Sequence, residues 1–513
     1  MPTYKSKDKP KDKRFTRRNF LKLVGAAGAA ATLSYLSPIG SQRYTALSSY
    51  SEPTSNARSS FQDTDTGPYS YVIHKKGSTY YADSKDFTRY SNADFKIVFE
   101  SATNTLGDEG GGRVIIKPLG SVSVNKTVWL LRSNIHVLCE ALGTTKLIPT
   151  SNNFAVLSIG NDVDQLYRIS VENLEVDFNG QDGASNGNCI KGQKVDGIRV
   201  HNCILGGSGS LGGQPSDPSC MSFSDCVNGV ISNNYAYNFS NGIGVTRGSS
   251  HFTIVGNRIT GINPYDSIYT FRSNGWNSII GNICTNASAF AGILVDGSPV
   301  GRNNNTTVAG NVCAGNNFGI YIYSSYDCVV SGNTCNDNIA AGIRVRAIGD
   351  HGGLTITGNS CKGNMDGMIT WESRWGSMSS NIVRGNTRYG IFLDKNSNHW
   401  AVQNNHIHLN GQGGIRFNTA SQVLVTGNNL RSNTESASNT YSEIYLAGSS
   451  SHNYFVSNYV DGSGAKYAIE EAATRDGNNL YRWNRIHGAW GTAATLINGT
   501  NSDADTELND ITT

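Results

Sequence analysis

A short pattern that recurs from Asn241 to about Leu496 limits what this chain can fold into. Glycine followed by isoleucine, or by a close substitute, returns at steps of 23 to 29 residues. The apolar runs are short, alternate with polar residues and end at Gly, Asn, Asp or Ser, which is typical of strands and turns. The apolar positions of this column are Ile243, Ile268, Ile293, Ile320, Ile343, Met368, Ile391, Ile415, Ile444 and Ile469.

A second column, made of asparagines, keeps the same step. A unit of about 24 residues that holds two or three strands is typical of one coil of a parallel β-helix. Coils stack at about 4.8 Å, so equivalent side chains lie above one another, and Asn amides can hydrogen-bond along such a stack. The column consists of Asn257, Asn282, Asn311, Asn333, Asn359, Asn381, Asn405, Asn428, Asn458 and Asn484.

The expected fold class is therefore all-β, a parallel β-helix that grows in one dimension and needs no division into globular domains. A helix is expected over about 92–107, with Asn92 as its N-cap and Gly107 as its C-cap. It would cover the open first coil, because an uncovered strand edge promotes aggregation. Its apolar face is Phe95, Val98, Phe99, Ala102 and Leu106.

The N-terminal residues are typical of a targeting signal rather than of the folded domain. The segment Thr-Arg-Arg-Asn-Phe-Leu-Lys at 16–22, followed by an apolar run, resembles a twin-arginine export signal. This resemblance implies a prokaryotic protein that is secreted, periplasmic or on the cell surface, with no stable membrane span after cleavage; an N-terminal membrane anchor is the alternative. The expected divisions are a signal at 1–40, a linker and early strands at 41–90, the β-helix at 91–495 and a tail at 496–513.

The charge of the chain bears on its partners. The formal net charge is +3, but residues 1–40 hold nine Lys or Arg and two Asp, so the remainder carries about −4. Because phosphate binding requires a basic surface, this balance argues against nucleic acid as the main partner.

Ten cysteines in an exported chain suggest disulfides. Four of them, however, stand in the column two residues after the asparagines, where other coils have Ile, Val or Leu, so we expect buried thiols there. Cys220 and Cys226 flank a turn and are better disulfide candidates. No zinc motif is present, and no cofactor is indicated with certainty. Carboxylates such as Asp296 are able to hold Ca²⁺, although no calcium-loop spacing marks a site.

One outward face is unusual. If each isoleucine of the Gly-Ile column points inward, the residues one and three positions later point outward. These positions are rich in Tyr, Trp, Phe, Arg and Asp, whereas a solvated face is expected to carry Thr, Ser, Lys and Asn. Aromatic rings suit sugar faces and arginine forks suit carboxylates; the alternative is a face chosen for β-propensity and covered by loops. The predicted substrate-binding residues are Tyr269, Asp296, Tyr321, Arg344, Trp371 and Arg416.

Two residues of this face suggest a reaction. Tyr323 and Arg346 share the third position on consecutive coils, with α-carbons expected about 5 Å apart. An arginine favours the phenolate of a neighbouring tyrosine and can neutralise the carboxylate of a uronate. Together they could remove the proton next to that carboxylate, which leads to β-elimination or epimerisation. His351, in the following turn, is a possible acid or base, or simply a surface histidine.

Carboxyl spacing provides an alternative. Glycosidases require two carboxyl groups about 5–9.5 Å apart. Asp296 and Asp394 are expected four coils apart, about 19 Å, which excludes them as that pair. Glu372 and Asp394 stand on neighbouring coils and are the candidates for glycoside hydrolysis.

Several motifs over roughly residues 90–495 resemble the pectate-lyase-like superfamily. They are the capping helix, Gly-Gly-Arg-Val-Ile-Ile-Lys-Pro at 111–118, Glu-Asn-Leu-Glu-Val-Asp at 172–177 and the Gly-Ile repeats. The resemblance implies a single-stranded right-handed parallel β-helix, and most members act on polysaccharides. Such motifs are specific for the fold and weakly specific for activity.

A shorter resemblance concerns Gly-Ile-Asn-Pro-Tyr-Asp at 261–266. It is similar to the Gly-Ile-Asp-Pro-His-Asp stretch of mannuronan C5-epimerases and related alginate lyases. Asn263 and Tyr265 depart from that pattern, so the resemblance implies a catalytic role only for Asp266.

Three functions remain open from the sequence. The first is a polysaccharide lyase or C5-epimerase that acts on an acidic glycan. The second is a glycoside hydrolase on the same fold. The third is a carbohydrate-binding or cell-surface protein without catalysis.

Overall fold

The computed structural model describes most of the chain beyond residue 69. The predicted export signal and His351 lie outside the described residues. These comprise residues 70–84, 89–151, 153–180, 187–208, 218–298, 303–346, 352–436, 439–462, 464–472, 477–488, 491–498, 502–504 and 510–512.

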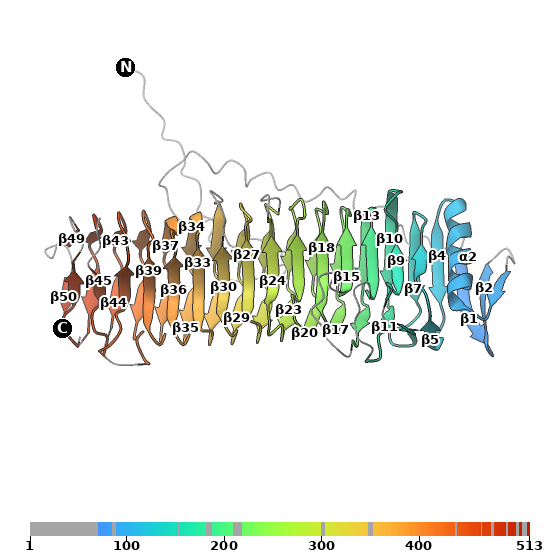
Figure 1. Ribbon diagram of the computed structural model, residues 1–513, viewed down its shortest axis with the longest axis horizontal. Coiled ribbons are helices and arrows are strands. Elements are labelled where there is room, and N and C mark those ends of the chain that lie inside the picture. The colour runs from blue at the N-terminus through green and yellow to red at the C-terminus, as the bar shows by residue number, and fades with distance from the viewer. Residues whose placement is uncertain are drawn as a thin grey trace, which may run out of the picture. The chain divides into compact units, whose positions relative to one another are not determined.

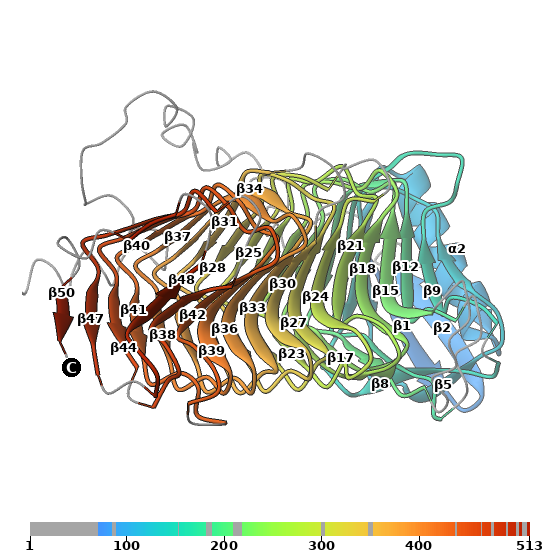
Figure 2. The ribbon, with the colours of Figure 1, turned by 60° about the vertical axis from the view of Figure 1, so that its left-hand side comes forward.

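Each coil contributes one strand to each of three sheets, which we name A, B and C, and the coils stack along one axis (Figures 1 and 2). Successive coils pair in parallel, whereas β1 (Ser70–Lys76) with β2 (Thr79–Ser84), and β2 with β3 (Arg89–Asn92), pair antiparallel at the N-terminal end of sheet A. The described part has about 14 right-handed turns and one short helix. The predicted all-β right-handed parallel β-helix is thereby confirmed. Its strands are short because each coil turns three corners, and each corner needs a left-handed or glycine residue.

The strands of the three sheets have the following bounds. Sheet C consists of β6 (Val128–Leu130), β9 (Leu157–Ile159), β12 (Ile190–Gln193), β15 (Ser219–Ser224), β18 (Asn241–Thr246), β21 (Ile268–Phe271), β24 (Ala291–Asp296), β27 (Phe318–Tyr323), β30 (Ala341–Arg346), β33 (Asp366–Trp371), β36 (Tyr389–Asp394), β39 (Gly413–Asn418), β42 (Ile444–Ala447), β45 (Ile469–Glu471) and β48 (Thr495–Ile497). Sheet B consists of β5 (Gly120–Val124), β8 (Thr145–Pro149), β11 (Glu175–Asp177), β14 (Ile204–Gly206), β17 (Tyr235–Phe239), β20 (Arg258–Ile262), β23 (Ile283–Thr285), β26 (Val312–Ala314), β29 (Thr334–Asn336), β32 (Ser360–Lys362), β35 (Ile382–Arg384), β38 (His406–His408), β41 (Asn429–Arg431), β44 (Tyr459–Asp461), β47 (Arg485–His487) and β50 (Asp510–Thr512). Sheet A consists of β1 (Ser70–Lys76), β2 (Thr79–Ser84), β3 (Arg89–Asn92), β4 (Gly112–Ile116), β7 (Ile135–Cys139), β10 (Leu166–Glu172), β13 (Val195–His201), β16 (Val230–Ser232), β19 (Thr253–Val255), β22 (Ser278–Ile280), β25 (Thr307–Ala309), β28 (Val329–Ser331), β31 (Leu354–Thr357), β34 (Arg374–Ser379), β37 (Asn398–Gln403), β40 (Leu424–Thr426), β43 (Tyr454–Val456), β46 (Leu480–Arg482) and β49 (Asp503–Ala504).

The register of sheet C follows the Gly-Ile column. Ile320 of β27 lies opposite Ile293 of β24 on one side and Ile343 of β30 on the other. All three isoleucines are fully buried, so the column forms the inward face of the sheet. The predicted column is confirmed, and it fixes which residues of each coil point outward.

The predicted asparagine column forms a continuous ladder at the corner between sheets A and B. The Asn311 amide Nδ2 donates to Asn333 Oδ1 at 3.0 Å, and the Asn333 amide donates to Asn359 Oδ1 at 2.9 Å. Each acceptor oxygen also receives the backbone N–H of the preceding ladder residue. The left-handed conformation belongs to the residue before each Asn, such as Gly332 with φ of 62°, rather than to the Asn itself.

A second ladder runs five residues after six consecutive asparagines of the first, and the sequence analysis did not identify it. Its amides are buried and bonded in the same way, with Asn338 Nδ2 donating to Asn364 Oδ1 at 2.9 Å. At its C-terminal end the carboxyl group of Glu443 accepts from both the backbone N–H and the amide of Asn433, at 2.8 and 2.6 Å. The ladder consists of Asn316, Asn338, Asn364, Asn386, Asn410, Asn433 and Glu443.

The cysteine column is buried and reduced, as predicted. Cys313 of β26 lies opposite Cys284 on one side and Cys335 on the other, and all are free thiols with no exposed surface. The better disulfide candidates, Cys220 and Cys226, are also free and buried. The expectation of a disulfide there is wrong, because both side chains pack in the core rather than flanking an exposed turn.

The capping helix α2 (Phe95–Asp108) lies at the N-terminal end of the stack, between β2 and β4 (Figure 1). Its N-cap is Asp94, whose carboxylate accepts from the Lys96 N–H at 2.9 Å, and its C-cap is Glu109. The predicted caps are thus displaced by two residues at each end. The predicted apolar face of α2 is buried and covers the first coil.

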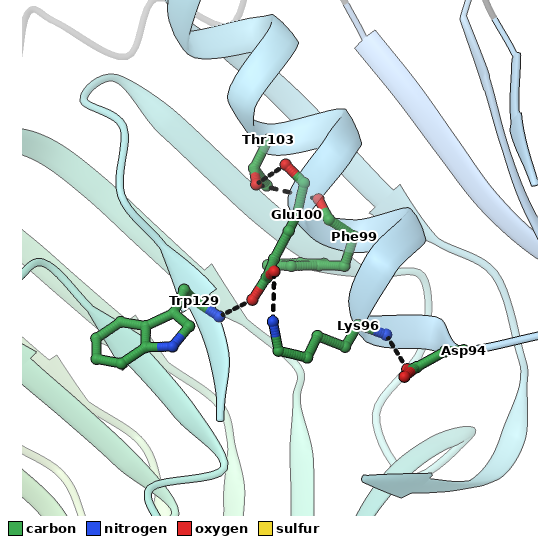
Figure 3. A network of polar contacts seen from close by, with 6 residues as sticks. All are labelled: Asp94, Lys96, Phe99, Glu100, Thr103 and Trp129. Atoms are coloured by element: carbon green, nitrogen blue, oxygen red, sulfur yellow. Dashed lines mark hydrogen bonds and ion pairs between the residues drawn. The ribbon is translucent and has the colours of Figure 1, made fainter. Parts of the chain in front are cut away.

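A polar network fastens α2 to the first coil of sheet C (Figure 3). The Glu100 carboxylate accepts from the backbone N–H of Trp129 in β6 at 2.8 Å and from Lys96 Nζ at 2.5 Å. The Trp129 N–H belongs to the first strand of the sheet, so Glu100 satisfies a donor that a preceding coil would otherwise bond.

The C-terminal coil extends beyond residue 495. Strand β50 pairs with β47 in parallel register, within the segment for which the sequence predicts a tail. Among the described residues, no helix is long and apolar enough to span a membrane.

Candidate functional site

The outward residues of sheet C align into the two columns predicted from the sequence. Tyr323 lies opposite Arg346, and Arg346 lies opposite Trp371 on the next coil. In the other column, Tyr321 lies opposite Arg344. Six consecutive strands therefore present aromatic and charged side chains on one side, which we call the sheet C face.

Arg344 is surrounded by aromatic rings. Its guanidinium carbon lies 4.8 Å from the ring centroid of Phe318, 5.1 Å from that of Tyr321 and 5.3 Å from that of Trp371. Its Nε atom is buried and has no hydrogen-bond partner among the described residues. No described carboxylate forms an ion pair with Arg344. Its guanidinium contacts aromatic rings instead, and it therefore remains able to bind an anion.

Arg346 stands between the predicted base and a carboxylate. Its guanidinium carbon lies 5.7 Å from the Tyr323 ring centroid and 5.4 Å from that of Trp371. The Glu372 carboxylate is 3.7 Å from Arg346 Nε, too far for a hydrogen bond. The predicted juxtaposition of Tyr323 and Arg346 is confirmed, whereas their catalytic role stays a prediction.

These side chains enclose a cavity of about 360 Å³, which we call the first hollow. Burial raises the pKa of Asp296, although the Ser298 N–H and the charge of Arg272 act in the opposite direction. Asp296 is therefore more easily protonated than an ordinary aspartate. The hollow is lined by Phe290, Leu294, Asp296, Phe318, Tyr321, Tyr323, Arg344 and Arg346.

The pKa of Tyr321 differs from the expectation that a neighbouring arginine favours the phenolate. Burial raises its pKa, and the nearby charges of Arg344 and Arg346 lower it by less. Proximity to arginine therefore does not make this phenol acidic, because the loss of hydration disfavours the phenolate more strongly. Tyr321 is suited to stacking and hydrogen bonding, and Tyr323 remains the candidate base.

The two carboxylates proposed for hydrolysis are adjacent along the stack but have different partners. Glu372 approaches Arg346 on the preceding coil. Asp394 accepts from the Asn418 amide on the following coil at 2.7 Å and from the Lys395 N–H at 2.9 Å. Their side-chain contacts thus point in opposite directions along the axis. Asp296 and Asp394 are separated by four register steps, as expected.

Asp266 is not among the residues that line the first hollow. It precedes β21, is 5% exposed and accepts from the Ala291 N–H at 3.0 Å. Burial raises its pKa well above the usual range. The structure gives this residue a hydrogen bond between consecutive coils, so its proposed catalytic role finds no support in its position. Tyr269 lies on the face, with its hydroxyl 3.0 Å from Ser219 Oγ.

Arg416 lies in a second cavity of the same face, which we call the second hollow, with a volume of about 280 Å³. Its guanidinium carbon lies 5.0 Å from the ring centroid of Tyr389, 5.6 Å from that of Phe392 and 5.1 Å from that of Tyr445. The Arg416 Nη1 donates to the Tyr389 hydroxyl at 2.5 Å. The hollow is lined by Tyr389, Gln412, Arg416, Thr440, Tyr441, Ser442, Tyr445, Lys466 and Glu470.

The sequence analysis missed two aromatic residues of this face, Phe318 and Tyr389. Each stands immediately before the glycine of a Gly-Ile pair, and strict alternation would place it inward. A side chain at Gly319 or Gly390 would meet core atoms of Cys335 or Ile407, so glycine and isoleucine both face inward and the preceding residue faces outward. The glycine itself is the signal that identifies these positions.

Metal binding finds no support in the described residues. No group of three or more His, Cys, Asp or Glu there is arranged to bind an ion.

Comparison with known proteins supports the fold. Residues 291–460 match a family model described as a right handed beta helix region, and residues 216–351 match a model for the periplasmic copper-binding protein NosD. Each match covers less than half of the chain. A search of curated proteins finds no match.

Similar solved structures are distant in sequence. The Azotobacter vinelandii mannuronan C-5 epimerase AlgE6 A-module is 17% identical and covers 82% of this chain and 95% of its own, with a TM-score of 0.35. The periplasmic alginate epimerase AlgG is 16% identical over 68% of this chain and 76% of its own, with a TM-score of 0.36. A tailspike protein of E. coli bacteriophage HK620, solved with a pentasaccharide, is 12% identical over 80% of this chain and 76% of its own, with a TM-score of 0.50. The chain therefore shares a right-handed β-helix fold with the tailspike.

Proposed function

We propose that this protein binds an acidic polysaccharide along the sheet C face and acts on it as a lyase or C5-epimerase. One observation carries the proposal: Arg344 and Arg346 lie side by side among aromatic rings at a cavity, and Arg344 has no carboxylate partner among the described residues. Rings offer flat apolar surfaces to sugars, and arginine forks bind carboxylates in two-point contacts. The tailspike with the same fold was solved with a pentasaccharide, which agrees with a carbohydrate ligand.

The proposed reaction begins with charge neutralisation. Arg346 and Arg344 bind the uronate carboxylate, which makes the proton on the neighbouring carbon more acidic. Tyr323 takes that proton as the phenolate, which becomes the neutral phenol. Asp296 lines the same hollow, and burial raises its pKa.

The two outcomes differ in where the electrons go next. In epimerisation a proton returns to the opposite side of the same carbon. In elimination the electron pair forms a carbon–carbon double bond, the bond to the glycosidic oxygen breaks, and that oxygen takes up a proton. Delivery of the protein to such a polymer requires export, so the twin-arginine-like segment at 16–22 is part of the proposal.

A panel of polyuronates tests the proposal. A lyase produces ultraviolet absorbance from the unsaturated sugar, and an epimerase changes the proton NMR spectrum of the uronate without shortening the chain. New reducing ends without absorbance would instead favour a hydrolase that uses Glu372 and Asp394. Binding without any product would favour a non-catalytic carbohydrate-binding protein, and no binding to any polyuronate would contradict the proposal.

The same assay is carried out with the variant Tyr323→Phe, which lacks the proposed base. Tyr235→Phe is the control, because Tyr235 is a partly exposed tyrosine of sheet B that lies outside the sheet C face. Product formation should fall in the first variant and remain unchanged in the second.

A further inference from the structure

The first and second hollows repeat one arrangement. In each, an arginine lies within about 6 Å of three ring centroids, and its Nε atom is buried without a hydrogen-bond partner among the described residues. The two arginines, Arg344 and Arg416, also occupy the same position in their coils. Such a repeated environment is not required by the fold, because equivalent positions elsewhere in the column carry Gly, Leu and Ile.

The register fixes the distance between the two arginines. Arg344 lies opposite Ile369, Ile369 opposite Phe392, and Phe392 opposite Arg416. Three coil steps separate them, or about 14 Å. The two residues between them in this column, Ile369 and Phe392, are apolar. A ligand that spans the two arginines can therefore contact these side chains without meeting another charge in the column.

Two charged side chains near this path, Arg388 and Glu470, are already paired. Arg388 donates two hydrogen bonds to the Asp366 carboxylate, at 3.0 and 2.5 Å. Glu470, in the second hollow, accepts from Ser442 at 2.5 Å and from Lys466 at 3.2 Å. Arg416 forms no ion pair with a described carboxylate, and it donates a hydrogen bond to the Tyr389 hydroxyl.

We propose that Arg416 forms a second carboxylate-binding subsite, and that the sheet C face thereby selects a linear chain of acidic sugars over a single acidic sugar. This inference rests on the proposed function and specifies its substrate. The rise of one coil is close to the length of one extended pyranose residue, so the two arginines would bind carboxylates about three residues apart. A tetrasaccharide is therefore the shortest ligand that reaches both.

Binding titrations with oligouronates, from disaccharide to octasaccharide, test this inference. For the unmodified protein, affinity should rise sharply between the trisaccharide and the tetrasaccharide. Arg416→Gln should lose about 10- to 100-fold in affinity for the tetrasaccharide and longer chains, the loss expected for one charge-assisted contact, and keep its affinity for the disaccharide. Arg416→Lys, which retains the charge without the fork, should lose less. Arg258→Gln is the matched control, since Arg258 also lies over a ring, that of Tyr235, but on sheet B.

The outcomes separate this inference from the proposed function. If the Arg344→Gln, Arg346→Gln double variant loses affinity for all oligouronates while Arg416→Gln retains the wild-type dependence on chain length, the second subsite is wrong and the proposed function stands. If the double variant binds every oligouronate as the unmodified protein does, the proposed function is wrong as well. Circular dichroism spectra that match the unmodified protein establish that each variant is folded.

Discussion

Tyr323 and Tyr321 stand two positions apart on one strand, yet they are suited to different tasks. Tyr321 is buried under Phe290, Phe318 and Arg344, and burial raises its pKa. Tyr323 lies at the open end of β27, where its ring faces Arg346. A proton-transfer group must reach the substrate, so position along the strand, rather than residue type, distinguishes the candidate base from the stacking tyrosine.

The first prediction concerns this pair. Tyr323→Phe keeps the ring and removes the hydroxyl, so binding of a polyuronate should persist while turnover falls by roughly 10²–10⁴-fold. Arg346→Lys should restore only part of the activity lost in Arg346→Gln, because lysine lacks the bidentate fork. Initial rates and dissociation constants on the same polymer are the measurements. If turnover in Tyr323→Phe is unchanged, Tyr323 is not the base.

Glu443 leads to a prediction about pH. Burial raises its pKa from 4.5 to about 8, so the folded protein keeps this proton over a range in which the unfolded chain has released it. Stability should therefore fall as pH rises from about 4.5 to 8, by on the order of a few kcal/mol, and level off above that. Denaturant midpoints across this range should decline less in Glu443→Gln. The exposed Glu140→Gln is the control, and an identical pH dependence in Glu443→Gln and the unmodified protein would contradict the account.

At the scale of elements, the asparagine ladders hold successive coils together. Asn333 accepts from the Asn311 N–H and amide and donates to Asn359 Oδ1 and the Val308 carbonyl. No water reaches this position, since Asn333 is 1% exposed. The hydrogen-bonding capacity of each ladder amide is thus satisfied by its neighbours. Removal of one amide leaves buried donors and acceptors on both adjacent coils without partners.

Asn333→Ala should accordingly destabilise the protein by about 3 kcal/mol or more, because several buried hydrogen-bonding groups lose their partners at once. The comparison is Asn317→Ala, whose side chain makes one bond at 3.3 Å near the surface and whose loss should cost about 0.5 kcal/mol or less. Chemical unfolding of both variants measures the difference. Equal destabilisation would show that the ladder contributes little beyond its backbone bonds.

The cysteine column gives a second prediction at this scale. Cys284, Cys313, Cys335 and Cys361 replace aliphatic residues in the core and are unbonded. All ten cysteines should therefore resist thiol labelling in the native state and react after denaturation without reductant. Fewer than ten labelled thiols, counted by mass spectrometry, would reveal a disulfide and contradict this packing.

The repeated elements explain how much the sequence could predict. The Gly-Ile and Asn columns fix the period and the register, and from these the outward neighbours of Tyr323 followed directly. The second ladder was visible as an Asn five residues after six consecutive first-ladder asparagines, but it was not recognised. Phe290 could not be placed, because it lies in a turn whose path depends on tertiary packing rather than on the repeat.

At the scale of the molecule, a solenoid builds a long binding face from small contributions. Each coil adds one or two outward side chains to the sheet C face, and the register keeps them about 4.8 Å apart. An extended polymer fits such a face better than a compact ligand. The register of Tyr323 and Arg346 was predictable, whereas the two hollows were only partly so, because alternation along a strand fails where glycine and isoleucine both face inward.

A crystal structure of the Tyr323→Phe variant with a bound octauronate tests the central claim most directly. The account predicts a sugar chain that runs along the sheet C face, with one carboxylate held between Arg344 and Arg346 and the scissile or epimerised residue beside position 323. A chain bound to sheet A, to sheet B or at a corner of the coils, with the sheet C face empty, would contradict it.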